Sequence, residues 1–207
     1  VFTGDMVNNF SHEISGWVPV WKKLKAKYGK FSVLGNHDYG DYSTWPTEVA
    51  KKKNLHEIIR QQKEMGFDVL MNENREVKIG DSSIEIIGVE NWGTPPFPQH
   101  GNIDKAFAGV KDASVKILLS HDPDHFEYII RDKYPIDLTL AGHTHGFQFG
   151  VEIGNFKLSP VQLKYKRWAG LYQEKNQYLY VNRGLGYLAF PGRVGIWPEI
   201  TLLELTK

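Results

Sequence analysis

FSVLGNHDYGDY, residues 31–42, joins an apolar run to a glycine and then to an amide, an imidazole and a carboxylate on consecutive residues. The apolar run lacks the in-out alternation of a half-exposed strand, which predicts a strand buried on both faces. Asn36, His37 and Asp38 follow where that strand ends. Gly, Asn and Asp are ordinary turn residues, because Asn and Asp can hydrogen-bond their own backbone. A binding site would use the same residues for chemistry, so the rest of the chain has to decide between a turn and a site.

Three other short runs share this apolar design with KFSVL (30–34). All four are rich in Val, Ile, Leu, Phe and Thr, and they predict strands buried on both faces, as in sheets that are covered by helices. The other three are VFT (1–3), VKILLS (115–120) and IDLTLA (136–141).

Helical patterns separate these strands, and the later part of the chain changes to alternating strands with Gly and Pro turns. This order predicts one α/β domain over residues 1–207, a layered sandwich with a mixed, partly antiparallel second sheet. The expected helices are SGWVPVWKKLKAKYG (15–29), KKNLHEIIRQQKEMG (52–66) and DPDHFEYIIRDK (122–133), and the expected late strands include QYLYVNRG (177–184) and EITLLEL (199–205).

Composition excludes some classes of protein. A formal charge of +1 gives no general attraction to nucleic acid, and the basic cluster KLSPVQLKYKR (157–167) has the character of a solvated face. No run of 18 or more apolar residues is present, so these residues are expected to form a soluble domain that does not span a membrane. Val1 is not methionine, and VFTGD (1–5) reads as the end of a buried strand. We therefore expect a missing N-terminal segment that could carry a membrane anchor.

Polar side chains follow each of the four buried runs. Asp5 follows the first run, Asn36 the second, His121 the third, and His143 and His145 the fourth. The carboxyl ends of strands in open α/β sheets form the crevice where ligands bind. The chain has no cysteine, so a metal there would have oxygen and nitrogen ligands, which suit Mn, Fe or Zn.

Each residue by itself has an ordinary structural role. Asp5 could cap a helix and Asn36 could fill a turn. Most lone histidines are surface or core residues, and that role is favoured for His12, His56, His100 and His125. The coincidence of donors at four strand ends favours a metal site over four separate structural roles.

The ordered set GD (4–5), GNHD (35–38), His121 and GHTH (142–145) resembles the metallophosphoesterase family, also called calcineurin-like phosphoesterases. The tail NRGLGYLAFPGRVGIWPEITLLEL (182–205) is similar to the bacterial branch of single-domain, often membrane-anchored phosphodiesterases. The resemblance implies a four-layer αββα double β-sandwich of mixed sheets flanked by helices, with two divalent metal ions in the site.

The resemblance also implies a role for each site residue. Asp5 bridges both ions, Asn36, His121 and His143 complete one of them, and His145 binds the other. His37 is implied to face the substrate phosphate without binding metal, and Asp38 to orient the His37 ring. The family's first motif, an Asp-x-His at the end of the first strand, is absent from these positions. We expect the first strand and this motif in the missing N-terminal segment, and the alternative is that this protein has lost the motif. Substrate-binding residues are not assigned, although aromatic and basic side chains lie in loops near the motifs: Tyr39, Tyr42, Trp45, Trp92, Phe147, Arg183 and Arg193.

By resemblance, the activity is hydrolysis of a phosphate ester at a dinuclear centre with a bridging hydroxide, as in a phosphodiesterase or pyrophosphatase. A small-molecule or lipid-linked substrate is expected, and nucleic acid is not. Two alternatives stay open: an enzyme like the UDP-2,3-diacylglucosamine pyrophosphatase of lipid A synthesis, and a non-catalytic scaffold with the same fold.

Overall fold

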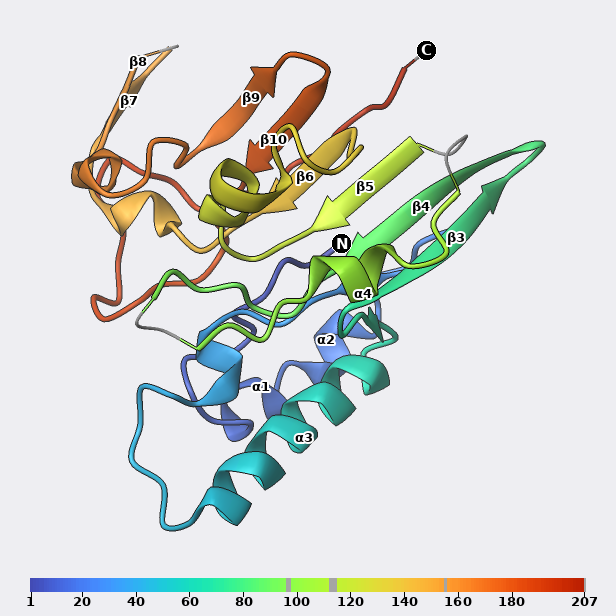
Figure 1. The fold of residues 1–207 in the computed structure, drawn as a ribbon. Helices are drawn as coiled ribbons and strands as arrows, with labels where there is room; N and C mark the ends of the chain where they lie inside the picture. The colour runs from blue at the N-terminus through green and yellow to red at the C-terminus, as the bar shows by residue number, and fades with distance from the viewer. Residues whose placement is uncertain (96–97, 112–114, 155, 207) are drawn as a thin grey trace.

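The computed structural model describes residues 1–95, 98–111, 115–154 and 156–206, and its main feature is a six-stranded mixed sheet (Figure 1). The sheet has the order β3-β4-β5-β6-β10-β9, in which the β4–β5, β5–β6 and β6–β10 pairs are parallel and the two outer pairs are antiparallel. Its strands are β3 (Glu73–Ile79), β4 (Ser82–Gly88), β5 (Val115–Leu119), β6 (Leu138–Ala141), β9 (Gly170–Glu174) and β10 (Gln177–Val181).

A second, smaller sheet packs against the first. It pairs β1 (Phe31–Ser32) with β2 (Asp68–Val69) in parallel, and Phe2 adds a parallel bridge to Ser32. Val33 and Leu70, just beyond β1 and β2, are fully buried in one cluster with Leu119 of the large sheet. The two sheets therefore bury a shared apolar layer between them.

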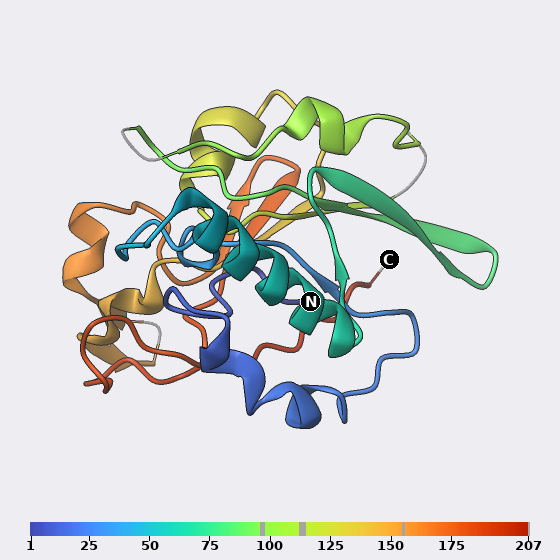
Figure 2. The same cartoon turned by 90° about the horizontal axis from the view of Figure 1, so that it is seen from below.

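Helices cover the outer face of each sheet. Over the small sheet lie α1 (His12–Ser15), α2 (Val18–Trp21) and α3 (Glu48–Glu64), whose apolar residues share a buried cluster with Val69. Over the large sheet lie α4 (Ile103–Phe107) and the π-helix η2 (Phe126–Ile130). Figures 1 and 2 show α3 on one side of the molecule and α4 on the other. The αββα sandwich expected from the sequence is confirmed.

The helix predicted over 52–66 is present as α3, and it starts four residues earlier than expected. Thr47 caps it, because its hydroxyl accepts a hydrogen bond of 3.1 Å from the amide of Ala50. The chain leaves α3 through Gly66, whose φ of +90° favours glycine.

The helix predicted over 15–29 is wrong beyond its first turns. Only α2 and the end of α1 form, and residues 22–29 are exposed. Most helix stability in proteins comes from burying an apolar face, and Leu24 and Tyr28, the large apolar residues of this stretch, stay exposed. Lys23 and Lys27 would also lie one turn apart with like charges.

Three other expectations need correction. The strand over 1–3 is reduced to the single bridge at Phe2, and the helix over 122–133 is only the five-residue η2. No strand forms over 199–205, where Ile200 and Leu202 are almost fully exposed. The alternation of apolar and polar residues over 199–205 does not by itself give this segment a neighbouring strand to pair with.

Short elements complete the described chain around the site. They are η1 (His37–Tyr39), η3 (His145–Gln148), η4 (Pro160–Leu163) and the antiparallel pair β7 (Val151–Ile153) and β8 (Phe156–Leu158). Among the described residues, no helix has the length and apolar character needed to cross a membrane.

Candidate metal centre

Four donor atoms from distant parts of the chain meet at one point. Nε2 of His121 lies 3.0 Å from Oδ2 of Asp5, from Oδ1 of Asn36 and from Nδ1 of His143. The ligand atoms of Asp5, His121 and His143 all lie within 4.8 Å of one another. The structure thus brings together the four residues predicted to complete one metal site.

Backbone conformation lets these side chains approach. Asp5 and His143 have left-handed backbone, with φ of +58° and +70°, which turns their side chains back over the strand ends. A Cβ on Gly35 would lie 2.2 Å from Oδ1 of Asp5 and 2.7 Å from Cε1 of His121. A Cβ on Gly4 would lie 2.5 Å from the amide of Gly35. Only glycine at both positions allows the two turns to lie this close.

Each of the four candidate ligands is also held by its second polar atom. Oδ1 of Asp5 accepts from the amide of His37 at 2.9 Å, and Nδ1 of His121 lies 2.7 Å from the carbonyl oxygen of Thr3. Two tyrosine hydroxyls hold the other two ligands: Nδ2 of Asn36 donates to Tyr42 at 2.8 Å, and Nε2 of His143 lies 2.7 Å from Tyr165. The atoms left facing one another are the four that could bind an ion.

The donor set fits a divalent cation. A carbonyl oxygen only accepts, so Nδ1 of His121 carries one ring proton, and Nε2 would present a lone pair to an ion once the metal-free ring gives up its second proton. The oxygens of Asp5 and Asn36 that face it are acceptors as well. Ligands about 2.1 Å from one ion and at right angles to each other are about 3.0 Å apart, which matches the observed spacing. One carboxylate, one amide and two imidazoles suit Mn, Fe or Zn.

Electrostatics at the cluster agree with a site for positive charge. Burial alone would lower the pKa of His121, but the charge of Asp5 and a hydrogen bond to it raise that pKa to about 9. Burial opposes ionisation of Asp5, but His121 holds the pKa of Asp5 well below its usual range. Burial lowers the pKa of His143 to about 3 and that of His145 to about 4, so both rings are neutral at pH 7. A neutral imidazole is the form that binds metal.

His145 lies outside this cluster. Among the described residues, its buried Nδ1 has no hydrogen-bond partner, and its carbonyl oxygen accepts from Arg193 at 3.2 Å. A buried nitrogen without a hydrogen-bond partner lowers the stability of the fold unless a ligand or an ion binds it. This arrangement suits the predicted role of His145 as a ligand of a second ion, and that role stays a prediction.

The structure gives Asp38 main-chain partners. Its fully buried carboxylate accepts hydrogen bonds of 2.8–2.9 Å from the amides of Asp5, Met6 and Gly35. Nδ1 of His37 lies 2.8 Å from the carbonyl oxygen of Asn8. Asp38 therefore ties together the turns that carry Asp5 and Asn36, and its orientation of the His37 ring stays a prediction.

The His37 side chain contributes no atom to the ligand cluster, and its predicted role beside the metal stays a prediction. Its ring stacks on Tyr42 with a centroid distance of 4.5 Å. Because Nδ1 carries the proton given to Asn8, Nε2 is the ring atom that can meet a substrate.

Most of the aromatic and basic candidates for substrate contact have structural roles. Tyr39 stacks on His100, Nε1 of Trp45 donates to Gly40, and Trp92 stacks on His125. Arg183 pairs with Glu152 and Glu199, and Arg193 donates to loop carbonyl groups. These contacts show that the three aromatic rings pack within the loops.

Sequence reasoning missed three partners of the ligands. Thr3 contributes only a main-chain oxygen, so no residue type could reveal it. Tyr42 was one of several loop aromatics without a role, and Tyr165 lies in the basic cluster 157–167. Their proximity to Asn36 and His143 is a result of the tertiary fold, and no motif spacing indicates it.

His125 provides a pH-dependent prediction away from the ligands. Burial lowers its pKa to about 3, and its Nδ1 lies 2.9 Å from the hydroxyl of Ser120. The unfolded chain has an ordinary histidine pKa near 6.5, so His125 does not oppose folding above that pH and destabilises the fold as the pH falls from 6.5 toward 3. We expect about 2 kcal/mol less stability at pH 5 than at pH 8 from this residue. Urea unfolding of His125→Gln should show a pH dependence smaller by that amount, and equal pH dependence in both proteins would refute the assignment.

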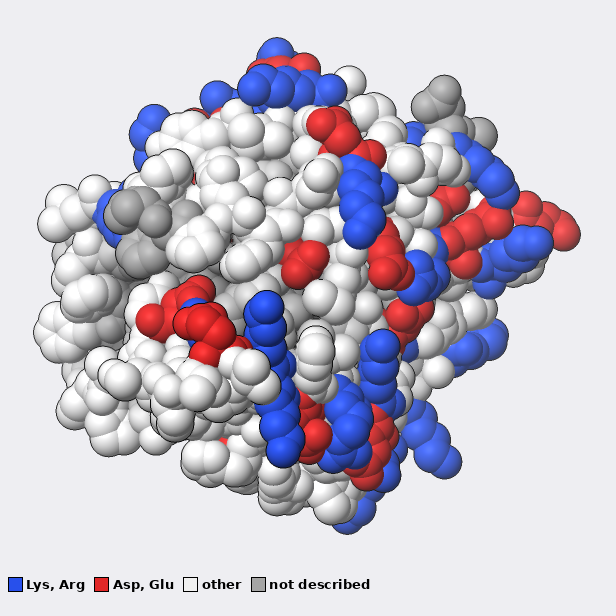
Figure 3. All heavy atoms as spheres, turned by 60° about the horizontal axis from the view of Figure 1, so that its bottom comes forward, with Lys and Arg blue, Asp and Glu red and all other residues white. Residues whose placement is uncertain are grey.

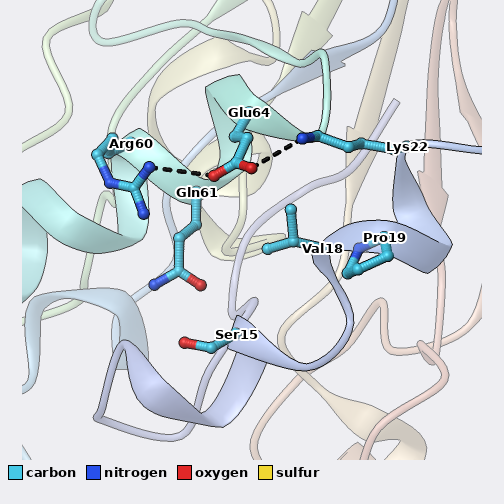
Figure 4. A pocket seen from close by; sticks show the side chains of 7 residues that line it. All are labelled: Ser15, Val18, Pro19, Lys22, Arg60, Gln61 and Glu64. Atoms are coloured by element: carbon cyan, nitrogen blue, oxygen red, sulfur yellow. Dashed lines mark hydrogen bonds and ion pairs between the residues drawn. The ribbon is translucent and has the colours of Figure 1, made fainter.

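The surface carries a pocket away from the candidate ligands and charges of both signs. The pocket has a volume of about 290 Å³ and is lined by residues of α1, α2 and α3, and no candidate ligand is among them. Figure 4 shows Glu64 paired there with Lys22 and Arg60. On the face in Figure 3, blue and red side chains alternate beside broad uncharged areas. The described part of this face carries no continuous basic band of the kind that binds nucleic acid.

Comparisons with known proteins agree with the geometry. A model of the calcineurin-like phosphoesterase family matches residues 1–147. The Bacillus subtilis metallophosphoesterase YkuE is 34% identical over 211 residues, covering 99% of this chain and 66% of YkuE. Phosphodiesterase YaeI of Escherichia coli K12 is 32% identical over 205 residues, covering 97% of this chain and 66% of YaeI. The chain thus spans 66% of the length of either relative.

A solved structure shows the same fold. Sulfate thiohydrolase SoxB of Thermus thermophilus, in complex with glycerol, superposes with a TM-score of 0.50 at 14% identity, over 87% of this chain and 33% of SoxB. At this identity the likeness concerns the fold alone.

The αββα sandwich carries a candidate metal centre, the donor cluster at its strand ends. The family match covers 147 of 207 residues and includes every candidate ligand. The chain belongs to the calcineurin-like phosphoesterase family, a family of metal-dependent phosphoester hydrolases. The family predicted from the ordered motifs is confirmed.

Proposed function

We propose that this protein is a metal-dependent phosphodiesterase that acts on a small or lipid-linked phosphodiester. The observation that carries the proposal is the convergence of Asp5, Asn36, His121 and His143 in a chain of this family. The name of YaeI, a phosphodiesterase at 32% identity, supports a diester as the substrate.

In this proposal the residues of the chain have distinct tasks. A pair of divalent ions would supply Lewis-acid stabilisation of the phosphoryl oxygens and a hydrolytic nucleophile at neutral pH. Asp5, Asn36, His121 and His143 would hold one ion, and Asp5 with His145 would contribute to the other. His37 would present Nε2 to a phosphoryl oxygen or to the leaving alkoxide, where it can hold or deliver a proton.

The test is an assay of the full chain with Mn²⁺, using bis-p-nitrophenyl phosphate beside p-nitrophenyl phosphate. We expect metal-dependent hydrolysis of the diester, with a larger kcat/KM than for the monoester, and loss of activity after treatment with a chelator. Preference for the monoester would refute the diester assignment. Bound Mn²⁺ with no hydrolysis of either compound would favour the non-catalytic scaffold.

A further inference from the structure

Two tyrosine hydroxyls bind the outward-facing atoms of two candidate ligands. Nε2 of His143 lies 2.7 Å from the hydroxyl of Tyr165, and Nδ2 of Asn36 donates to the hydroxyl of Tyr42 at 2.8 Å. The other two ligands, Asp5 and His121, are held by main-chain groups instead. The tyrosines are therefore the side chains on which the orientation of half of the ligand set depends.

We propose that Tyr165 and Tyr42 are positioning residues of the metal centre, which fix Nδ1 of His143 and Oδ1 of Asn36 toward the ion. The inference rests on the metal site of the proposed function. With a cation bound to Nδ1, the ring proton of His143 is on Nε2 and is donated to the Tyr165 oxygen. With a cation bound to Oδ1, the amide nitrogen of Asn36 donates to the Tyr42 oxygen in the same way.

Tyr165 is itself held rigidly. It packs with Trp168 and Ile196 in a buried cluster, and its amide donates to the carbonyl oxygen of Val161 at 2.9 Å. The His143 ring meets the Tyr165 ring edge to face, at a centroid distance of 5.4 Å. The hydroxyl of Thr144, next to His143, donates to the carbonyl oxygen of Trp168 at 2.7 Å, so the same cluster anchors the ligand loop.

This arrangement gives the chain beyond the family match a part in the metal site. The family model ends at residue 147, and Tyr165 follows η4. A buried hydroxyl cannot be replaced by water when it is removed, whereas the half-exposed Tyr42 can be replaced in part. The effect of losing the hydroxyl should therefore be larger at Tyr165 than at Tyr42.

The experiment compares Tyr165→Phe and Tyr42→Phe with the unchanged full chain by calorimetric titration of the metal-free protein with Mn²⁺. We expect the Kd to rise about 10-fold to 100-fold for Tyr165→Phe, and about 10-fold or less for Tyr42→Phe. Tyr134→Phe is the matched control, because it removes a hydrogen bond of 2.6 Å to Asp104 away from the cluster. Its Kd should not change.

A second readout separates positioning from packing. In the Zn²⁺-loaded protein, ¹⁵N NMR of the histidine rings should show His143 with its proton on Nε2, and Tyr165→Phe should shift that resonance while thermal unfolding changes little. Mn²⁺ affinity within about threefold of the unchanged chain in both tyrosine variants, with no shift of the resonance, would overturn this inference alone. Failure of the unchanged chain to bind Mn²⁺ would overturn the metal site of the proposed function, and this inference with it.

Discussion

Replacement of His37 by alanine is expected to lower kcat on a phosphodiester by about 10²-fold to 10⁴-fold while the affinity for Mn²⁺ stays within about threefold. The side chain of His37 is tied to the carbonyl oxygen of Asn8 and to the ring of Tyr42, and it contributes no atom to the ligand cluster. The main-chain amide of His37 does help to position Asp5, because it donates a hydrogen bond to Oδ1 of that residue. Alanine keeps that amide, so Asp5 should stay in place.

The measurement pairs steady-state kinetics with calorimetric titration of Mn²⁺ on the same protein. His56→Ala is the control, because His56 is an exposed histidine of α3 outside the cluster, and its kinetics should match those of the unchanged chain. Loss of metal binding in His37→Ala would mean that His37 is a ligand. Unchanged kcat with intact metal binding would remove His37 from the reaction.

The candidate ligands were predictable from the sequence because they follow the ends of strands, and the end of a buried strand can be recognised where an apolar run stops. Asp5, Asn36, His121 and His143 each follow an apolar run, and a sheet brings such ends to one edge. The order and spacing of the motifs also predicted the family. Neither of these two signals depends on contacts between segments that are distant in the sequence.

What could not be predicted depends on contacts between distant segments. Asp38 is adjacent to His37 in sequence, which suggested that it orients the ring, but in three dimensions it accepts from three main-chain amides, two of them in the turn that carries Asp5. Tyr165 lies 22 residues beyond His143 and meets it only through the packing of the late chain. Local sequence patterns describe residue types and periodicity. They do not show which main-chain groups will need a side chain as a hydrogen-bond partner.

The same distinction explains the errors in the fold. The α3 helix was predictable because its apolar residues recur at helical spacing and join the buried cluster over the small sheet. Its start was not predicted, since it depends on the cap at Thr47. Residues 22–29 and 199–205 have helical and strand patterns without a surface to cover them. A helical or strand-like sequence pattern predicts a helix or strand correctly only where another layer of the fold buries its apolar side.

Replacement of Asp38 by alanine is expected to lower the free energy of unfolding by about 3 kcal/mol or more, because it leaves three main-chain amides without an acceptor at a buried position. The turns that carry Asp5 and Asn36 would then lose the group that joins them. We therefore expect Mn²⁺ affinity to fall together with stability, which distinguishes this variant from His37→Ala.

Urea unfolding of the metal-free protein measures the effect without a contribution from bound ions. Asp41→Ala is the matched control three residues further along the same loop, because the interaction that Asp41 makes with the described residues is an ion pair with Lys51. Its removal should cost less than about 1 kcal/mol. If Asp38 served only to orient His37, Asp38→Ala would keep both its stability and its Mn²⁺ affinity and would lose turnover alone. The three short hydrogen bonds to main-chain amides predict the opposite pattern.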